Sequence, residues 1–217
     1  MWSILNEEKL SNFLQVLEDQ NFQIACITET WFDSQNGKFT AAIKNAGFKL
    51  IHSHREGKRG GGTAIMYKNQ LKIKKGEESS SKYASFEFSY IIVIYDSTNL
   101  ILVCIYRKQE VHFKTFYNEL ESFMDKLSER VEELLVVGDF NVWADAADDQ
   151  DTKSLMKLMN AYGLTQIVSE PTHREGHTLD HNYINPHGLA VKHTVHSDTF
   201  NISTDHYPCI MKLPDCS

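Results

Sequence analysis

The sequence predicts a mixed α/β fold, and three observations support this. Short apolar runs of strand length end in polar residues, as at Phe22–Ile27, Leu100–Ile105 and Leu134–Val137. Apolar stripes at helical spacing lie between some of these runs, and the longest stripe spans residues 113–127. Elsewhere, predicted strands follow one another with no helix between them, which disfavours a purely parallel, doubly wound sheet.

The first half of the chain begins with a helix and continues mainly with strands. Leu10, Phe13, Leu14 and Leu17 mark the buried face of that helix, and Asn6 is its expected N-cap. A strand at Phe22–Ile27 and a helix at Lys38–Asn45 follow. The next predicted strands are Phe48–Ser53, Gly61–Tyr67, Tyr83–Ile94 with or without a break, and Leu100–Tyr106.

The second half opens with the long amphipathic helix, whose aromatic residues are expected in the core. A strand at Leu134–Asp139 follows, then an acidic loop and a helix at Thr152–Tyr162. The remaining predicted strands are Thr178–Ile184, Ala190–His196 and Tyr207–Leu213.

Bulk composition sets the broad class of the protein. A length of 217 residues with 41% hydrophobic content suits one domain, which we assign to residues 1–217. No apolar run approaches the ~20 residues needed to span a bilayer, and no signal peptide is evident. The four cysteines show no pairing pattern, so an intracellular, reducing compartment is expected. The formal net charge of −7 counts against generic affinity for nucleic acids.

The segment Gly138-Asp139-Phe140-Asn141 is the most informative motif, because it follows an apolar strand directly. Asp139 and Asn141 are two residues apart, so on a continued strand their side chains point the same way. They would then present a base and a hydrogen-bond donor together at the rim of a sheet. The alternative is an ordinary turn, in which Gly, Asp and Asn are common.

Four more polar residues or pairs stand at predicted strand ends. They are Glu29 in Ile27–Trp31, Tyr106 before Arg107, Asp180 in Thr178–His181, and Asp205-His206 before the last strand. Each has an ordinary structural explanation: a strand-end acid, a half-buried strand aromatic, or a polar turn. Their common position and their order together favour a functional site.

This order resembles the endonuclease/exonuclease/phosphatase superfamily from about Leu10 to the C-terminus. Within it, the chain is most similar to the AP-like endonuclease domain of non-LTR (LINE-type) retrotransposons. The narrower likeness rests on these segments: Thr28–Trp31, Arg59–Ile65, Pro171-Thr172 and Gly176–His181.

The resemblance implies two stacked mixed β-sheets flanked by helices, the four-layer DNase I-like sandwich. In that superfamily the first strand usually carries an Asn that faces the metal site. Here helix signals begin near Asn6, so we expect the first strand to be truncated or absent. Its loss would leave an unpaired position in one sheet.

The resemblance also assigns roles to residues. Glu29 would be the main ligand of Mg²⁺, or of Mn²⁺, with Asp205 beside the metal. Asp139 would activate the attacking water, and Asn141 would donate to a phosphate oxygen. Asp180 would orient His206 on the scissile phosphate, and Tyr106 would contact the phosphate or the leaving group. The expected DNA-binding residues are Arg59, Thr172 and Thr178, although the glycines after Arg59 are equally well explained by a tight turn.

The implied function is a metal-dependent endonuclease that nicks double-stranded DNA to prime reverse transcription. Its expected partner is a reverse transcriptase domain encoded downstream, and the protein is expected to be monomeric, nuclear and not membrane-bound. Two alternatives stay open: a phosphatase or phospholipase of the same superfamily, and a catalytically impaired DNA-binding remnant.

Overall fold

The computed structural model describes residues 6–32, 37–53, 60–76, 80–94, 99–128, 133–185, 192–196 and 204–213. Its helices are α1 (Glu7–Asp19), α2 (Gly37–Asn45), α3 (Phe113–Ser128) and α4 (Gln150–Ala161), with a short 3-10 helix at Ser80–Lys82. Its strands are β1 (Ile24–Thr28), β2 (Phe48–Ser53), β3 (Thr63–Lys68), β4 (Ile73–Lys75), β5 (Phe86–Ile94), β6 (Asn99–Arg107), β7 (Glu133–Asp139), β8 (Thr165–Gln166), β9 (Asp180–Ile184), β10 (Lys192–Val195) and β11 (Cys209–Lys212).

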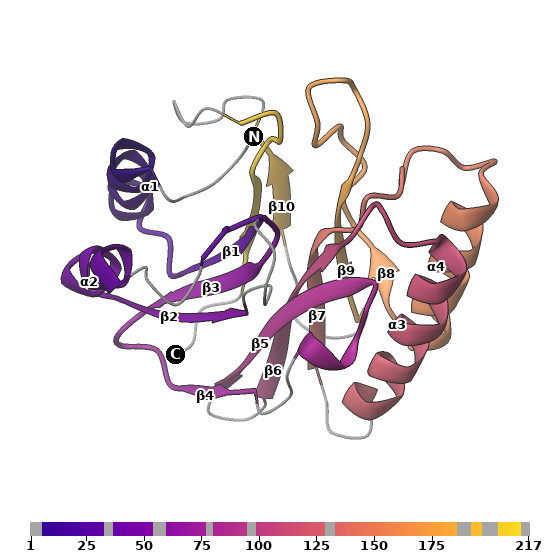
Figure 1. Cartoon of the computed structure of the whole chain (residues 1–217), viewed down its shortest axis with the longest axis horizontal. Coiled ribbons are helices and arrows are strands. Elements are labelled where there is room, and N and C mark those ends of the chain that lie inside the picture. Colours follow the sequence, from indigo (N-terminus) through magenta and orange to yellow (C-terminus); the bar gives the residue numbers. More distant parts are fainter. Residues whose placement is uncertain are drawn as a thin grey trace.

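The elements form the four layers that the resemblance implies. One sheet has six strands in the order β4-β5-β6-β7-β9-β8, and β6 and β7 are parallel within it. Facing it are a three-stranded sheet, β1-β3-β2, and the two-stranded pair β10-β11. Helices α1 and α2 cover the outer side of the three-stranded sheet, while α3 and α4 cover the outer side of the six-stranded sheet (Figure 1). The prediction of two stacked sheets between helices is confirmed.

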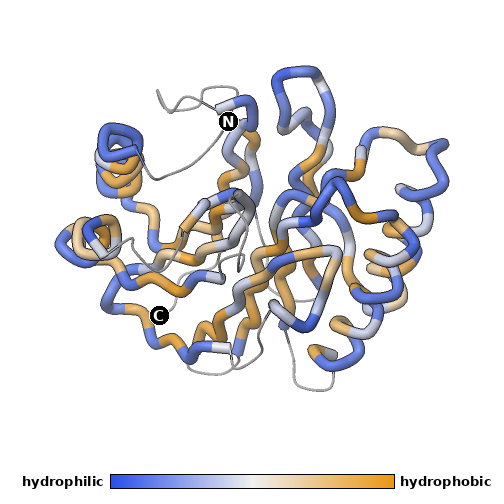
Figure 2. The backbone as a smooth tube through the Cα atoms, viewed as in Figure 1, coloured by the Kyte–Doolittle hydropathy of each residue, from blue (hydrophilic) through white to orange (hydrophobic). Residues whose placement is uncertain are grey.

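Three apolar clusters fill the spaces between the layers. One packs α3 and α4 on the six-stranded sheet, with Phe116 and Phe123 completely buried. A second joins the two sheets through residues such as Ile65 and Leu102, and a third lies beneath α1 and α2. Hydrophobic residues accordingly follow the strands and the inner sides of the helices (Figure 2). The aromatic residues of α3 are core residues, as predicted.

Most predicted elements are confirmed to within a few residues. The side chain of Asn6 caps α1, because its Oδ1 accepts hydrogen bonds from the backbone N–H of Glu8 and Lys9 at 2.9 and 3.2 Å. The strand expected at Tyr83–Ile94, with or without a break, is the unbroken β5, which begins three residues later than predicted, at Phe86. The sequence did not reveal β4 or β8, which have three and two residues and are too short to show a period.

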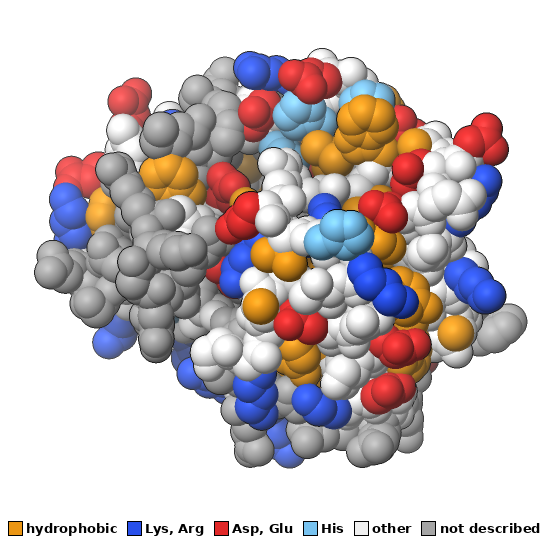
Figure 3. Space-filling model, turned by 45° about the vertical axis from the view of Figure 1, so that its right-hand side comes forward, with side chains coloured by type: hydrophobic (Ala, Val, Ile, Leu, Met, Phe, Trp, Pro, Cys, Tyr) orange, Lys and Arg blue, Asp and Glu red, His pale blue; other side chains and the backbone are white. Residues whose placement is uncertain are grey.

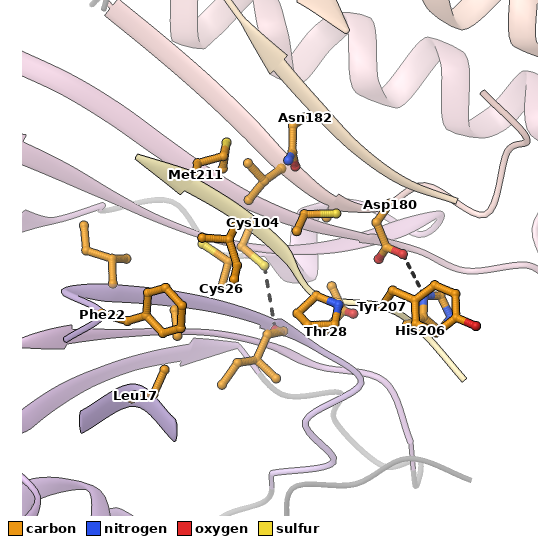
Figure 4. A pocket seen from close by; sticks show the side chains of 18 of the residues that line it. Leu17, Phe22, Cys26, Thr28, Cys104, Asp180, Asn182, His206, Tyr207 and Met211 are labelled. Atoms are coloured by element: carbon orange, nitrogen blue, oxygen red, sulfur yellow. Dashed lines mark hydrogen bonds and ion pairs between the residues drawn. The ribbon is translucent and has the colours of Figure 1, made fainter. Parts of the chain in front are cut away.

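The expected loss of the first strand concerns residues 1–5, which lie outside the described residues, but the described strands leave an opening between the sheets. Within the described part of the chain, α1 is the first element, β1 pairs only with β3, and β11 pairs only with β10. A cavity of about 400 Å³ separates these two open strand edges. Cys26, Cys104 and Met211 line its apolar part (Figure 4). No helix in the described ranges is long and apolar enough to cross a membrane.

Candidate functional site

Sheet register places three of the predicted site residues in a row. Tyr106 on β6 is the partner of Asp139 on the parallel strand β7, and Asp139 is the partner of Asp180 on β9. Directly paired residues lie on the same face of a sheet, so their side chains are neighbours. All three stand where β6 and β7 end and the antiparallel β9 begins, at one edge of the sheet. Strand pairing therefore assembles the centre of the site.

Gly138 allows β7 to approach β6 at this edge. Its φ is +137°, and a Cβ built there would lie 2.0 Å from the carbonyl oxygen of Ile105, its partner on β6. Such a separation is far shorter than any van der Waals contact. Only glycine fits, so the glycine before Asp139 is a structural requirement of the motif.

Glu29 extends from the three-stranded sheet toward Tyr106, Asp139 and Asp180. It follows β1 directly, and its carboxylate accepts a short hydrogen bond from the hydroxyl of Tyr106. Tyr106, which is buried, thus orients Glu29 across the gap between the sheets.

The glycine run Gly60–Gly62 shapes the loop that carries Glu29. The carbonyls of Gly61 and Gly62 accept hydrogen bonds from the backbone N–H of Trp31 and Thr30 at 2.9 and 3.3 Å. All three glycines have positive φ angles, and a Cβ on Gly62 would lie 2.6 Å from the Thr30 hydroxyl. For these glycines the tight-turn explanation is supported. Arg59 lies outside the described residues.

His206 stands beside Asp180. Its Nδ1 is 2.8 Å from Oδ2 of Asp180, which leaves Nε2 as the nitrogen without this contact (Figure 4). Glu29, Asp180 and His206 all line the same cavity, together with Gly138. The predicted convergence of separate strand ends on one site is therefore observed.

Burial and charge repulsion together raise the pKa of Asp139 to about 7. Burial is the largest cause, because it penalises the ionised form, and the neighbouring charges of Asp180 and Glu29 act in the same direction. The positive charge of His206 and a 2.9 Å hydrogen bond from the backbone N–H of Asn141 partly oppose this rise. Asp139 is therefore a carboxylate that can both take up and release a proton near neutral pH.

His206 is held in its cationic form. Burial would lower its pKa, but the charge and hydrogen bond of Asp180, with the charges of Asp139 and Asp205, raise that pKa to about 9. A cation faces a group of carboxylates at this point, so an anion that approaches the site meets one fixed positive charge.

Asn141 does not lie on a continued strand. β7 ends at Asp139, and Asn141 has a φ of +48°, so the alternation argument does not extend to it. Its side-chain Nδ2 donates to the carbonyl of Arg107 at 2.7 Å, and its Oδ1 accepts from Nε2 of Gln109 at 2.5 Å. One amide hydrogen of Asn141 is not used in these contacts.

Thr172 and Thr178 support the site from within the protein. Their side chains are 0% and 2% exposed. The Thr172 hydroxyl oxygen accepts hydrogen bonds from the backbone N–H of Leu179 and Asp180 at 2.9 and 3.0 Å, and the Thr178 hydroxyl donates to the carbonyl of Glu170 at 2.9 Å. The structure does not support direct contact of either side chain with DNA. Thr172 instead fixes the start of β9 and so positions Asp180.

Three residues near the site were missed in the sequence. Arg107 donates from Nη1 to the carbonyl of Asn141 at 2.9 Å, and Gln109 holds the Asn141 side chain. His173 packs its ring edge-on against His206, with ring centroids 5.0 Å apart. Arg107 and Gln109 lie one and three residues after Tyr106, so their closeness to a candidate residue was a signal in the sequence. The pairing of residue 173 with residue 206 has no such signal and is visible only in the fold.

The described residues form no continuous basic patch on the face drawn in Figure 3. There, lysine and arginine side chains are scattered among the described residues, and histidines lie beside acidic side chains. This distribution matches the negative net charge of the chain.

The donor set fits a hard divalent cation. Glu29, Asp139, Asp180 and Asp205 supply carboxylate oxygens, which Mg²⁺ prefers, and repulsion from Asp180 and Glu29 adds to burial in raising the pKa of Asp139. A bound cation would relieve that repulsion. Such a site can bind a metal, abstract a proton from water, and place a cationic imidazole against an anion, which are the elements of phosphoester hydrolysis.

Comparisons with known proteins identify the fold and the family. None of the curated proteins matches the chain. Among solved structures, the endonuclease domain of TRAS1, a telomere-specific non-LTR retrotransposon, is similar at a TM-score of 0.70 and 15% identity, covering 98% of this chain and 95% of that one. The 3′ phosphatase NExo from Neisseria is similar at 0.72 and 18% identity, with 97% and 95% covered. An AP endonuclease from Archaeoglobus fulgidus is similar at 0.73 and 15% identity, with 98% and 96% covered.

These similarities to solved structures show the fold, and a match to a family model shows the family. The model of the endonuclease/exonuclease/phosphatase family matches residues 2–206, nearly the whole chain. With the carboxylates and the imidazole gathered at one end of the two sheets, this chain belongs to the endonuclease/exonuclease/phosphatase family.

Proposed function

We propose that the protein is a Mg²⁺-dependent phosphodiesterase that nicks one strand of double-stranded DNA. The observation that carries this proposal is the convergence of Glu29, Asp139 and the Asp180–His206 pair on one end of the sandwich. Each group has a distinct role in phosphodiester hydrolysis.

Asp139 acts as the general base. In its ionised form it takes a proton from the attacking water, and its pKa of about 7 places the required form near physiological pH. Burial and the hydrogen bond from the Asn141 backbone hold the carboxylate in one orientation. Such a positioned base is expected to contribute ~10²- to 10⁴-fold in rate.

His206 and Asn141 stabilise the negative charge on the phosphate. The Nε2–H of cationic His206 donates to a phosphate oxygen, while Asp180 keeps the ring charged and oriented. The unused amide hydrogen of Asn141 gives a second donor. Both donors are fixed before substrate arrives, so their orientation costs nothing at the moment of reaction.

The metal would be held by Glu29, which Tyr106 orients, with Asp205 at the side of His206. Mg²⁺, or Mn²⁺ in its place, supplies Lewis-acid stabilisation of the phosphate charge when bound.

The substrate assignment rests on the family and the sequence motifs. TRAS1 is a retrotransposon endonuclease, and the Archaeoglobus protein is an AP endonuclease. We infer that this chain is the DNA-cutting domain of a non-LTR retrotransposon. The nick would prime reverse transcription by a polymerase domain encoded downstream, in the nucleus, with the nuclease domain acting as a monomer.

Relaxation of supercoiled plasmid tests the proposal directly. The wild-type protein is expected to produce open circles with Mg²⁺ and none with EDTA. Asp139→Asn and His206→Ala should each lower the rate at least ~10²-fold. The matched control Asp19→Asn changes an exposed residue on α1 and should cleave normally. Metal-independent relaxation, or normal cleavage by Asp139→Asn, would contradict the mechanism.

Two other outcomes identify other functions. Activity on a 3′-phosphate and not on plasmid would favour a phosphatase, the activity named for the Neisseria structure. Salt-sensitive DNA binding without cleavage would identify a catalytically impaired remnant. The open position beside β1 favours this second candidate, since it adjoins Glu29 in the same cavity.

A further inference from the structure

A second group of metal-binding side chains lies beside the proposed catalytic centre. His173, Asp205 and His206 each offer one ligand atom, and these three atoms all lie within 4.8 Å of one another. We propose that these residues form an alternative site, which shares Asp205 and His206 with the proposed catalytic centre, for a soft or borderline transition metal such as Zn²⁺, and that its occupation removes His206 from the reaction. Binding itself does not depend on the proposed function, whereas inhibition does.

Backbone pairing holds the three residues in place. Residues 173 and 206 form an antiparallel β-bridge. On its two sides, the N–H of Arg174 donates to the carbonyl of Asp205 at 2.9 Å, and the N–H of Tyr207 donates to the carbonyl of Thr172 at 2.7 Å. Because both segments are tied together at the site, bringing the ligands together requires little further loss of conformational entropy.

The side-chain contacts resemble the surroundings of a metal-bound histidine. Asp180 contacts Nδ1 of His206 at 2.8 Å and leaves Nε2 for the metal, a carboxylate–histidine arrangement typical of zinc ligands. Nε2 of His173 is already 3.7 Å from Oδ2 of Asp205. Tetrahedral Zn²⁺, with bonds of about 2.0–2.2 Å, holds its ligand atoms about 3.3 Å apart, so small side-chain rotations complete the geometry.

Ligand chemistry separates this site from the proposed Mg²⁺ site. Two imidazoles and one carboxylate suit Zn²⁺ or Cu²⁺, while Mg²⁺ selects oxygen ligands and avoids imidazole. The Nδ1 of His173 accepts a 3.3 Å hydrogen bond from the N–H of Glu175, and metal binding at Nε2 would give up that long bond. A metal with high affinity for imidazole tolerates this loss. Three protein ligands leave a fourth position for water.

Occupation would have a chemical consequence for the proposed nuclease. With Nε2 of His206 bonded to metal, the residue has no N–H to donate to a phosphate oxygen. Asp205 would be shared between the two sites. Zn²⁺ should therefore inhibit Mg²⁺-supported cleavage, and His173 should control this inhibition.

Calorimetric titration of the metal-free protein with Zn²⁺ tests the site. We expect one tight site, with affinity at least ~10-fold lower in His173→Ala and in His173→Gln. The second variant keeps a polar side chain of similar length in case the first disturbs folding. The matched control is His177→Ala: this histidine contacts Asp145 at 3.0 Å and lies outside the cluster. Unchanged affinity in both His173 variants, or an equal loss in His177→Ala, would overturn the proposal.

Cobalt gives an independent readout. Co²⁺ in the wild-type protein should show the intense visible absorption of a four-coordinate site, and the two His173 variants should lose it. In plasmid nicking, the Zn²⁺ concentration for half inhibition should rise at least ~10-fold in His173→Gln relative to its own uninhibited rate. If the wild-type protein binds Zn²⁺ through His173 but cleaves no DNA, the metal site stands and the proposed function fails.

Discussion

At the scale of single residues, the site is built from groups whose charges are not balanced within it. Asp139 is buried beside Asp180 and Glu29, and the imidazolium of His206 offsets part of their charge. This imbalance is costly for folding and useful for chemistry, because it prepares both a base and a place for a cation. Supporting residues such as Thr172 keep these charges aligned.

Replacing Thr172 distinguishes support from DNA contact. Thr172→Val keeps the shape but removes the oxygen that accepts from the N–H of Leu179 and Asp180, so two part-buried donors lose this acceptor. We expect the free energy of unfolding in urea to fall by about 2–4 kcal/mol. Thr172→Ser keeps an acceptor and should lose less than about 1 kcal/mol.

DNA affinity supplies the opposite readout for Thr172. Measured by fluorescence anisotropy in EDTA, the affinity of folded Thr172→Val should stay within about threefold of wild type, since the side chain is buried. A large loss of affinity with unchanged stability would restore Thr172 as a DNA-binding residue.

At the scale of elements, pairing of β6, β7 and β9 places the site, and one glycine makes that pairing possible. The parallel β6–β7 contact brings Tyr106 level with Asp139, and the antiparallel β7–β9 contact brings Asp180 level with both. A one-residue slip would turn each side chain to the other face of the sheet. The loop after β1 then adds Glu29 from the facing sheet.

Gly138→Ala tests this arrangement. The new Cβ would lie 2.0 Å from the Ile105 carbonyl oxygen, so the two strands must separate. We expect a loss of about 3 kcal/mol or more in the free energy of unfolding, and loss of nicking. Gly47→Ala is the matched control, because Gly47 also has a positive φ, +81°, but its added Cβ meets nothing within 4 Å. It should cost about 1 kcal/mol. Equal losses in the two variants would show that backbone strain alone explains the effect.

At the scale of the whole molecule, titration of Asp139 and His206 should lower stability as pH rises, whereas the buried His181, whose pKa is lowered to about 4, acts in the opposite direction below pH 6.5. Asp139 has its pKa raised from 3.8 to about 7 in the folded state, so folding weakens as pH rises between these values. His206 has its pKa raised from 6.5 to about 9, so the stability it contributes is complete below pH 6.5 and is lost by pH 9. Both shifts act in the same direction between pH 4 and 9.

Asp139→Asn should flatten this decline. The amide cannot ionise, and its removal of one negative charge also reduces the shift of His206. In EDTA at pH 8, the variant should be more stable than wild type by about 1–3 kcal/mol in urea unfolding, although it is inactive. Asp19→Asn should keep the wild-type pH dependence. An Asp139→Asn protein that is less stable than wild type at pH 8 would contradict the charge imbalance.

Much of the fold could be predicted from local patterns. Helices with clear amphipathic stripes and strands with apolar runs were predicted with only small errors at their ends, because periodicity records which face is buried. β4 and β8 were missed because a strand of two or three residues has no measurable period. The glycine run before β3 was ambiguous, since the sequence cannot tell a turn that shapes a loop from one that approaches a ligand.

Local hydrophobic pattern identifies the polar residues that end the strands, and with the family resemblance it predicts the fold class and the candidates Glu29, Tyr106, Asp139, Asp180 and His206. Only the tertiary structure decided which of them touch, that Thr172 and Thr178 are buried, and that His173 lies beside Asp205 and His206. The reason is physical: strand ends are encoded locally by hydrophobic pattern, whereas contacts between residues far apart in the chain depend on register and on how the sheets stack.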